Sequence, residues 1–201
     1  MLQSFYKAGI IEAGIDEAGR GCYAGPVFAA AVVLPPDFHH PRLNDSKQLK
    51  EKDRDLLRPI IEAEAIAWSV QAVEVEVIDR INILQATYRA MHAAVDNLAT
   101  RPELLLVDGK WFKPVKGIAH QCFIKGDGTY ASIAAASILA KTHRDEYMQQ
   151  LHESFPHYNW RQNKGYGTLD HRRAIEQFGI CRHHRKSFNI LPSQLDIPFK
   201  S

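Results

Sequence analysis

Four acidic residues stand where apolar segments end, and their side chains limit the chemistry that this chain supports. Asp16 and Glu17 follow "AGIIEAGI", Asp108 closes "ELLLVD", and Asp127 lies in "FIKGDGT". Carboxylates that converge at strand ends repel one another unless a cation neutralises them. Hard divalent cations prefer oxygen ligands and often bind substrate phosphates as well. The acids therefore predict a Mg²⁺ or Mn²⁺ site, whereas a cluster built from carboxylates alone fits zinc poorly.

Each of these acids also has a structural explanation. Asp108-Gly109 is a common turn dipeptide after a strand, and Asp127 has the side chain of a helix cap. Asp16 and Glu17 are neighbours, and neighbours on a regular strand point to opposite faces of the sheet. Both serve one site only if the strand breaks there, and the glycines that follow allow such a break.

The glycine-rich segment after Glu17 is interpreted as a bare backbone surface for a ligand. Its spacing, Gly19-x-Gly21-x-x-x-Gly25, differs from the dinucleotide fingerprint, and the chain contains no P-loop motif. The segment that follows it is predicted to be a strand, so no helix N-terminus faces a pyrophosphate. Glycines let N–H and C=O groups approach a ligand closely, and such a surface can inspect a group as small as a hydroxyl.

Alternating strand and helix patterns predict an α/β fold, with a mixed sheet flanked by helices. Strands are predicted over residues 10–16, 27–34, 66–73, 103–108 and 118–124. Helices are predicted from Asp45 or Ser46 to residue 65, and over residues 75–99, 130–152 and 169–179. The 130–152 helix begins with small residues almost throughout, which allows close packing on the sheet.

Composition predicts a single globular domain. The chain has 201 residues, 45% of them hydrophobic and 24% charged, so we expect one domain over residues 1–190 and a flexible tail over 191–201. No apolar stretch reaches the roughly 20 residues of a membrane span, and the start lacks the layout of a signal peptide. We therefore expect a cytoplasmic monomer without membrane contact. Three scattered cysteines indicate neither a disulfide framework nor a zinc site.

Basic residues are concentrated in the C-terminal half of the chain. Residues 110–190 contain 13 Lys and Arg against 6 Asp and Glu, a net charge of +7, and the remaining residues carry a net charge of −5. This asymmetry fits a phosphate-bearing partner, although a lysine-rich solvated surface gives the same count.

Six motifs, in this order and spanning most of the chain, resemble bacterial ribonuclease HII of the type 2 ribonuclease H family: "GIDEAGRGCYAGPVFAAAVVLP", "NDSKQLK", "LLLVDGK", "KGDGTYASIAAASILAKTHRD", "NKGYGTLDHRRAI" and "HHRKSF". The resemblance implies an RNase H-like fold with a small C-terminal helical extension. It also implies a metal-dependent endoribonuclease that cuts the RNA strand of RNA–DNA hybrids and cuts at ribonucleotides embedded in duplex DNA, a step of ribonucleotide excision repair. Mn²⁺ or Mg²⁺ would be its cofactor.

The resemblance also assigns roles to particular residues. Asp16, Glu17, Asp108 and Asp127 match the catalytic, metal-binding acids. Gly19, Arg20 and Gly21 match the segment that recognises the 2′-OH of the ribonucleotide, and Lys47 matches a phosphate contact. Tyr166 takes part in this recognition as the tyrosine that stacks on the adjoining deoxyribose, and its structural alternative is a core tyrosine in a turn. One position departs from the family pattern, because Gly128 stands where alanine is expected.

A two-metal mechanism follows for such a site. Two cations, typically about 3.5–4 Å apart in such sites, would straddle the scissile phosphate, and they would activate water and stabilise the leaving 3′ oxygen. The products carry 5′-phosphate and 3′-hydroxyl ends. Further basic residues are expected to hold backbone phosphates without sequence preference, namely Arg172, Arg173, Arg185 and Lys186.

The C-terminal tail resembles a six-residue sliding-clamp-binding motif. It runs from Gln194 to Phe199, with Leu195, Ile197 and Phe199 as apolar anchors. A short extended peptide that places alternate side chains in a groove is a known recognition mode. The alternative is a tail that folds back on the domain.

Two other functions remain open at the level of sequence. Another metal-dependent nuclease of the same fold class, such as a resolvase, would use similar acids on pure DNA. A non-catalytic nucleic-acid-binding module would use the basic half alone.

Overall fold

A five-stranded mixed sheet forms the middle layer of the fold. The structure is a computed structural model that describes residues 2–44, 46 and 48–190. The strand order is β3-β2-β1-β4-β5, formed by β1 (Glu12–Ala18), β2 (Val27–Val33), β3 (Ala67–Val73), β4 (Leu104–Asp108) and β5 (Ala119–Phe123). The β1–β2 and β2–β3 pairs are antiparallel, whereas β4 lies parallel to both β1 and β5. The predicted α/β fold with a mixed sheet is confirmed.

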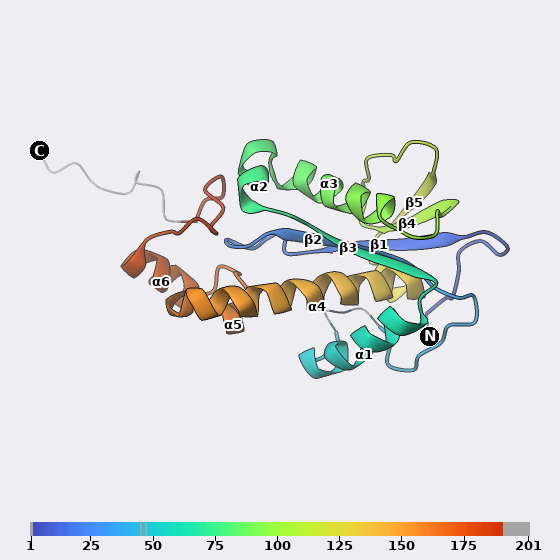
Figure 1. Cartoon of the computed structure of the whole chain (residues 1–201), viewed down its shortest axis with the longest axis horizontal. Helices are drawn as coiled ribbons and strands as arrows, with labels where there is room; N and C mark the ends of the chain where they lie inside the picture. The colour runs from blue at the N-terminus through green and yellow to red at the C-terminus, as the bar shows by residue number, and fades with distance from the viewer. Residues whose placement is uncertain (1, 45, 47, 191–201) are drawn as a thin grey trace, which may run out of the picture.

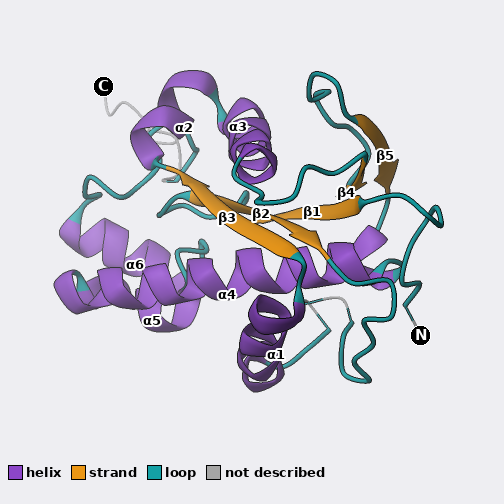
Figure 2. Cartoon of the chain, turned by 45° about the vertical axis from the view of Figure 1, so that its right-hand side comes forward, coloured by secondary structure: helices purple, strands orange, loops and turns teal. Residues whose placement is uncertain are grey.

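Helices cover both faces of this sheet (Figures 1 and 2). One face carries α2 (Val75–Ile81) and α3 (Ile83–Asp96), and the other carries α4 (Ala131–Ser154) with α1 (Glu51–Glu64) packed beside it. Every residue of β2 is buried because both faces of this strand are covered. Within the described residues, no helix is both long and apolar enough to cross a membrane.

The small residues at the start of α4 allow it to lie directly on β1. A Cβ atom on Gly14 would stand 2.1 Å from the carbonyl carbon of Ser132, so only glycine permits this approach. The close contact matters for function, because it brings Ser137 and Lys141 of α4 beside the end of β1.

Two predicted helix boundaries are wrong. Ser46 does not begin α1, which starts at Glu51 after a turn, because the Ser46 hydroxyl is used in a tertiary hydrogen bond of 2.6 Å with Ser137. The other candidate cap, Asp45, lies outside the described residues. The predicted 75–99 helix is divided at Asn82, whose φ of 66° ends α2 and whose side chain accepts from the N–H groups of Leu84 and Gln85 to cap α3.

A small helical part packs against the C-terminal half of α4. It consists of the 3₁₀ turn η2 (Pro156–Tyr158), α5 (Trp160–Asn163) and α6 (Leu169–Phe178), with α6 ending at Gly179 as expected. Its core gathers Met148 of α4 with Tyr158, Trp160 and Ile175. The tail that we predicted over residues 191–201 lies outside the described residues.

Candidate active site

Three aspartates meet at one end of the sheet. One carboxylate oxygen from each of Asp16, Asp108 and Asp127 lies within 4.8 Å of the other two. The parallel register of β1 and β4 explains the first pair, because Ile15 stands opposite Val107 and the next residues are Asp16 and Asp108. Both aspartates alternate onto the face that packs against α4. This arrangement brings together three of the four acids that the sequence singled out.

The third aspartate is delivered by the 3₁₀ turn η1 (Gly126–Gly128). Lys125 adopts a left-handed conformation with φ of 58°, and the N–H of Gly126 then donates to Oδ1 of Asp108 at 2.8 Å. The Asp108 carboxylate therefore holds the turn that carries Asp127. The N-cap position of α4 is occupied by Tyr130, so the helix-cap explanation for Asp127 is wrong.

Glu17 lies beside this cluster and faces the other way. The strand β1 continues in register through Ala18, which pairs with Phe28, so the predicted break after Asp16 is wrong. The ordinary alternation of a strand therefore separates the two neighbouring acids. Glu17 instead forms an ion pair of 3.1 Å with the guanidinium of Arg20. Its place at the end of β1 still leaves it at the edge of the same pocket.

The pocket at the acids has a volume of about 220 Å³. It is lined by Asp16, Glu17, Ala18, Gly19, Arg20, Gly21, Ser46, Asp108, Ser137, Lys141 and Tyr166. Three of the four predicted acids, Tyr166 and part of the glycine turn (residues 19–26, between β1 and β2) thus line one pocket, although they come from separate parts of the chain.

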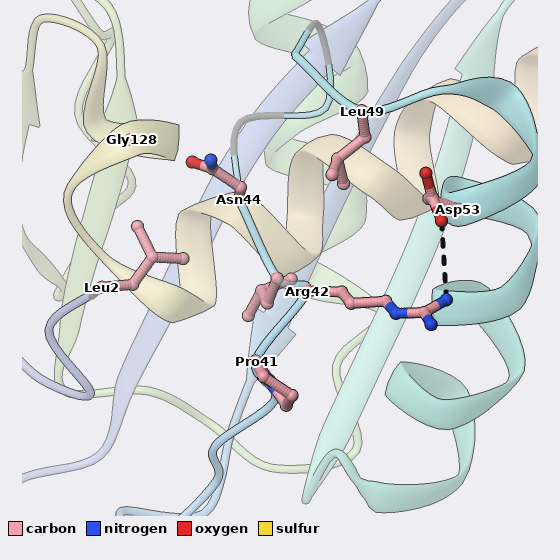
Figure 3. A pocket seen from close by; sticks show the side chains of 8 residues that line it. Leu2, Pro41, Arg42, Asn44, Leu49, Asp53 and Gly128 are labelled. Atoms are coloured by element: carbon pink, nitrogen blue, oxygen red, sulfur yellow. Dashed lines mark ion pairs between the residues drawn. The ribbon is translucent and has the colours of Figure 1, made fainter.

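A second pocket, of about 530 Å³, lies beside Gly128 (Figure 3). Its walls include Leu2, Asn44 and an ion pair of 3.6 Å between Arg42 and Asp53. None of the clustered aspartates lines it. We therefore place the chemistry in the smaller pocket, where the titratable groups converge.

The electrostatics of the smaller pocket favour a cation. Burial, and next the charges of Glu17 and Asp108, raise the pKa of Asp16 well above its usual value. Hydrogen bonds from Ser137 and from the N–H of Glu17, the latter 2.7 Å long, offset this only in part. A divalent cation removes the repulsion, and an all-oxygen donor set suits Mg²⁺ or Mn²⁺. The residues present therefore fit such an ion.

Two buried arginines fix the glycine turn beneath the pocket. Nη1 of Arg185 donates to the carbonyl of Arg20 at 2.8 Å, and its Nε and Nη2 donate to the carbonyl of Gly25. Arg144 donates to the carbonyls of Ala24 and Pro26. Guanidinium groups with several donors in a fixed fork suit such clustered carbonyls.

The prediction that Arg185 holds a substrate phosphate conflicts with its position. Its side chain is fully buried, because the carbonyls of the tight glycine turn draw it inward. Burial lowers the pKa of Arg185 to about 10, so it stays charged at neutral pH. Its guanidinium donates to the carbonyls of Arg20 and Gly25, and Arg185 does not line the pocket, so its contacts are structural.

Tyr166 stands next to the glycine turn. Its side chain is 41% exposed, which disfavours a purely core role. The N–H of Tyr23 donates to the carbonyl of Gly165 at 2.8 Å, tying the two segments together. A Cβ on Gly167 would lie 2.4 Å from the Tyr23 ring, so glycine is required there for this approach.

Comparisons with known proteins identify the family of the chain. Residues 13–191 match the family model for Ribonuclease HII. The chain is 58% identical over 199 residues to ribonuclease HII of Parabacteroides distasonis, covering 99% of this chain and all of that protein. The protein of Porphyromonas gingivalis is 54% identical over 188 residues, 94% of each chain. The chain belongs to the ribonuclease HII family.

Ribonuclease HII is a family of metal-dependent endoribonucleases, so the chain is an enzyme of that class. The fold is similar to the RNase HII in the PCNA:RNase HII complex from Archaeoglobus fulgidus, with a TM-score of 0.76, 26% identity, and coverage of 93% of this chain and 99% of that one. It is also similar to ribonuclease H2 from Pyrococcus horikoshii, with a TM-score of 0.74, 24% identity, and coverage of 89% and 94%. The expected RNase H-like fold is confirmed.

Sequence reasoning missed a hydrogen-bonded histidine pair behind Tyr166. The N–H of Cys181 donates to Nδ1 of His184, whose Nε2 lies 3.1 Å from Nε2 of His171. Nδ1 of His171 lies 2.9 Å from the carbonyl of Tyr166, which assigns a proton to that nitrogen. Burial, followed by repulsion from His171, lowers the pKa of His184 to about 4. Both histidines lie in motifs whose arginines and lysines indicate an exposed basic surface, so the sequence does not mark them as buried.

Lys141 is a second residue that sequence reasoning missed. Its ammonium lines the pocket and is ion-paired with Asp145 one helical turn later. Burial lowers the pKa of Lys141, and the neighbouring Asp145 opposes that shift. The i, i+4 spacing of the two residues in α4 is the signal that could have marked this pair.

The other predicted cations have different surroundings. Arg172, Arg173 and Lys186 are exposed, as phosphate contacts require. Nε of Arg172 also donates to the carbonyl of Gly167, next to Tyr166, at 3.0 Å. Lys47 and the clamp-motif residues Gln194, Leu195, Ile197 and Phe199 lie outside the described residues.

Proposed function

We propose that the chain cuts nucleic-acid duplexes at ribonucleotides, both in the RNA strand of RNA–DNA hybrids and at ribonucleotides embedded in duplex DNA. Hydrolysis would leave 5′-phosphate and 3′-hydroxyl ends. The observation that carries this proposal is the gathering of Asp16, Asp108, the glycine turn and Tyr166 around one pocket of about 220 Å³. Asp127 completes the acid cluster, with a carboxylate oxygen within 4.8 Å of those of Asp16 and Asp108. The family membership given above supports the class of reaction.

Asp16, Asp108 and Asp127 would hold the divalent metal, and Glu17 would complete a pair of metal sites from the pocket edge. A bound cation supplies Lewis-acid stabilisation of the phosphate and lowers the pKa of coordinated water. The protein's part is to hold the acids ionised and close together. Ser137 and the Glu17 N–H serve this purpose at Asp16, and the Gly126 N–H serves it at Asp108.

Selectivity for ribose would come from the backbone of Gly19, Arg20 and Gly21. A hydroxyl is both donor and acceptor, so a bare peptide that offers an N–H and a carbonyl can recognise it. This turn is held from below by the buried Arg185 and Arg144, which keeps its peptide groups in place without substrate. Tyr166 would lie against the adjoining sugar, where a deoxyribose leaves room for its ring.

Affinity would come largely from phosphate contacts outside the pocket. Arg172, Arg173 and Lys186 are exposed, and Lys47 is expected to join them. Such contacts act on any duplex and weaken with salt. Arg185 is not included, because its side chain is buried.

Matched duplexes test this function. The enzyme is incubated with an all-DNA duplex, the same duplex with one ribonucleotide, and an RNA–DNA hybrid, each with Mn²⁺, with Mg²⁺ and with chelator. We expect metal-dependent cutting of the second and third substrates only, with 5′-phosphate product ends. Equal cutting of the all-DNA duplex would favour a resolvase-type nuclease instead.

An acid variant separates catalysis from binding. Asp108→Asn should abolish cutting while hybrid binding, measured by fluorescence anisotropy, is retained. Binding by both proteins with cutting by neither would indicate a non-catalytic binding module.

We also propose that the tail binds a sliding clamp through Gln194, Leu195, Ile197 and Phe199. An archaeal relative has been solved in a PCNA:RNase HII complex, which shows that a clamp-bound member exists. Pull-down with purified bacterial clamp compares the full chain with a chain ending at Pro192. Equal retention of the two chains rejects this role for the tail.

A further inference from the structure

An exposed tryptophan lies in the loop that directly follows Asp108, and it has no part in the site described above. Trp111 follows Asp108 by three residues, in the loop of residues 109–118 that joins β4 to β5, and its side chain is 73% exposed. By contrast, Trp160 is fully buried and Trp68 is half-buried. A solvent-exposed aromatic side chain as large as tryptophan often indicates a binding surface.

The fold holds this loop in place. The ring of Phe112, the next residue, packs edge-on against Tyr88 and His92 of α3 at centroid distances of 6.3 and 5.4 Å. Nε2 of His92 lies 2.7 Å from the carbonyl of Lys113, and the N–H of Gly109 donates to the carbonyl of Phe123 at 2.8 Å. Because Phe112 is anchored, the exposure of Trp111 is built into the loop.

The segment around Trp111 is basic in sequence, and Asp96 of α3 is the acid that lines a pocket together with Lys113. Residues 109–126 contain four lysines and no acidic residue, and all four lysines are exposed: Lys110, Lys113, Lys116 and Lys125. The ammonium of Lys110 lies 5.6 Å from the centroid of the Trp111 indole ring. Figures 1 and 2 place this loop on the sheet face covered by α2 and α3, opposite α4.

An exposed aromatic ring among lysines is complementary to a nucleic acid. The ring stacks on a base or sugar at little cost in conformational entropy, and the ammonium groups neutralise phosphates. A protein partner of apolar character fits less well, because it would leave these lysines desolvated and unpaired.

We propose that the loop of residues 109–118 binds the duplex that flanks the cut, with Trp111 stacking on a nucleotide and Lys110 and Lys113 contacting phosphates. This proposal rests on the proposed function, since it extends the substrate beyond the metal site. It adds a contact on the α3 side of the sheet to those of the glycine turn and of α6. The contact contributes affinity and leaves the chemistry at the acids unchanged.

Tryptophan fluorescence tests the contact directly. The full chain is titrated in chelator with uncut duplex carrying one ribonucleotide, and anisotropy of the labelled duplex reports binding in parallel. We expect the emission to change on binding, with most of the change lost in Trp111→Phe and retained in Trp68→Phe. Binding by anisotropy with no change in emission of the wild-type chain overturns the proposal.

Kinetics give a second readout. Trp111→Ala should raise KM about tenfold and leave kcat within about twofold, because a stacking contact is lost outside the chemical step. Leu56→Ala in α1, which removes an apolar side chain that is 48% exposed, serves as the control and should change neither constant. An unchanged KM in Trp111→Ala contradicts the proposal. Absence of cutting by the wild-type chain would instead contradict the proposed function, while the fluorescence titration would still report on the loop.

Discussion

Nη1 of Arg185 donates a hydrogen bond of 2.8 Å to the backbone carbonyl of Arg20, across 165 positions of sequence. One residue of the glycine turn is thereby supported by a buried cation from the C-terminal part. The side chain that supports the turn and the exposed Lys186 are direct neighbours in sequence, yet only one of them is reachable by solvent.

This contrast predicts opposite effects for two neighbouring substitutions. Arg185→Met should lower the free energy of unfolding by about 2–4 kcal/mol, because three buried charge-assisted hydrogen bonds are lost and carbonyls are left unpaired. The Arg185→Met protein that still folds should be less selective, so its cutting of the ribonucleotide-containing duplex should exceed its cutting of the all-DNA duplex by a smaller factor than in the wild type. Urea denaturation and the paired cleavage assay measure the two effects.

Lys186→Ala is the matched control for that experiment. The unfolding free energy of Lys186→Ala should stay within about 0.5 kcal/mol of that of the wild type. The slope of log affinity for the duplex against log salt concentration should become shallower by roughly one, because one phosphate contact is lost. Loss of stability in Lys186→Ala with none in Arg185→Met would contradict the burial described here.

The acid cluster predicts that removing one charge stabilises the metal-free protein. The pKa of Asp16 is raised in the folded state, so folding disfavours its charged form. The resulting loss of stability is relieved progressively as the pH falls from the folded pKa to the usual value near 3.8, or when a cation binds. In chelator at pH 7, Asp108→Asn should raise the unfolding free energy by about 1–2 kcal/mol. The asparagine oxygen can still accept from the Gly126 N–H, so the turn is kept.

Metal addition supplies the converse measurement. Mn²⁺ should raise the melting temperature of the wild-type protein and raise that of Asp108→Asn much less. Differential scanning fluorimetry with and without the ion is sufficient. Equal stabilisation of both proteins would place the cation away from these acids.

The sheet was predictable because its strands are short apolar runs bounded by turn residues. The helices were predicted less well where a polar side chain had a better partner than the helix backbone. Asn82 caps α3 with its own oxygen and so divides the predicted 75–99 helix, and Ser46 bonds Ser137 instead of beginning α1. Both outcomes depend on local or tertiary hydrogen bonds that apolar periodicity does not contain.

The site divides in a similar way. Acids at strand ends predicted the convergence of Asp16, Asp108 and Asp127, since strand order alone brings such ends together. The sequence gives the charge of Arg185 and carries no sign of its burial, which depends on carbonyls of a turn far away in the chain. The expected roles of the pocket residues stay predictions until the assays above are done.

The buried histidine pair predicts a loss of stability in mild acid. The pKa of His184 is about 4 in the folded protein against 6.5 for an exposed histidine, so the unfolded chain binds a proton first as the pH falls. The stability contributed above pH 6.5 is therefore lost between pH 6.5 and about 4, by on the order of 3 kcal/mol. Asp16 acts in the opposite direction, because its folded pKa is raised.

A variant isolates the histidine contribution from that of the carboxyl groups. His184→Asn removes the titrating group, so the difference in unfolding free energy between wild type and variant should shrink as the pH is lowered from 7.5 to 5. Urea denaturation at several pH values measures it. A difference that does not change with pH would show that His184 does not titrate in this range.

Two glycines of the turn that carries Asp127 should respond differently to alanine. A Cβ on Gly128 meets nothing within 4 Å, so Gly128→Ala should keep full cutting activity. It should raise the unfolding free energy by up to about 1 kcal/mol, because alanine lowers the conformational entropy of the unfolded chain.

A Cβ on Gly126 would stand 2.6 Å from Cδ1 of Ile133 and 3.0 Å from Cβ of Phe123. Relief of that clash should shift the N–H of Gly126 that donates to Asp108. Gly126→Ala should therefore lose about 1–3 kcal/mol of stability and most of its metal-dependent activity, because Asp127 leaves the other two carboxylates. Calorimetry and the cleavage assay on both variants test the pair, and equal behaviour of the two alanines would mean that the Gly126 contact does not position the third acid.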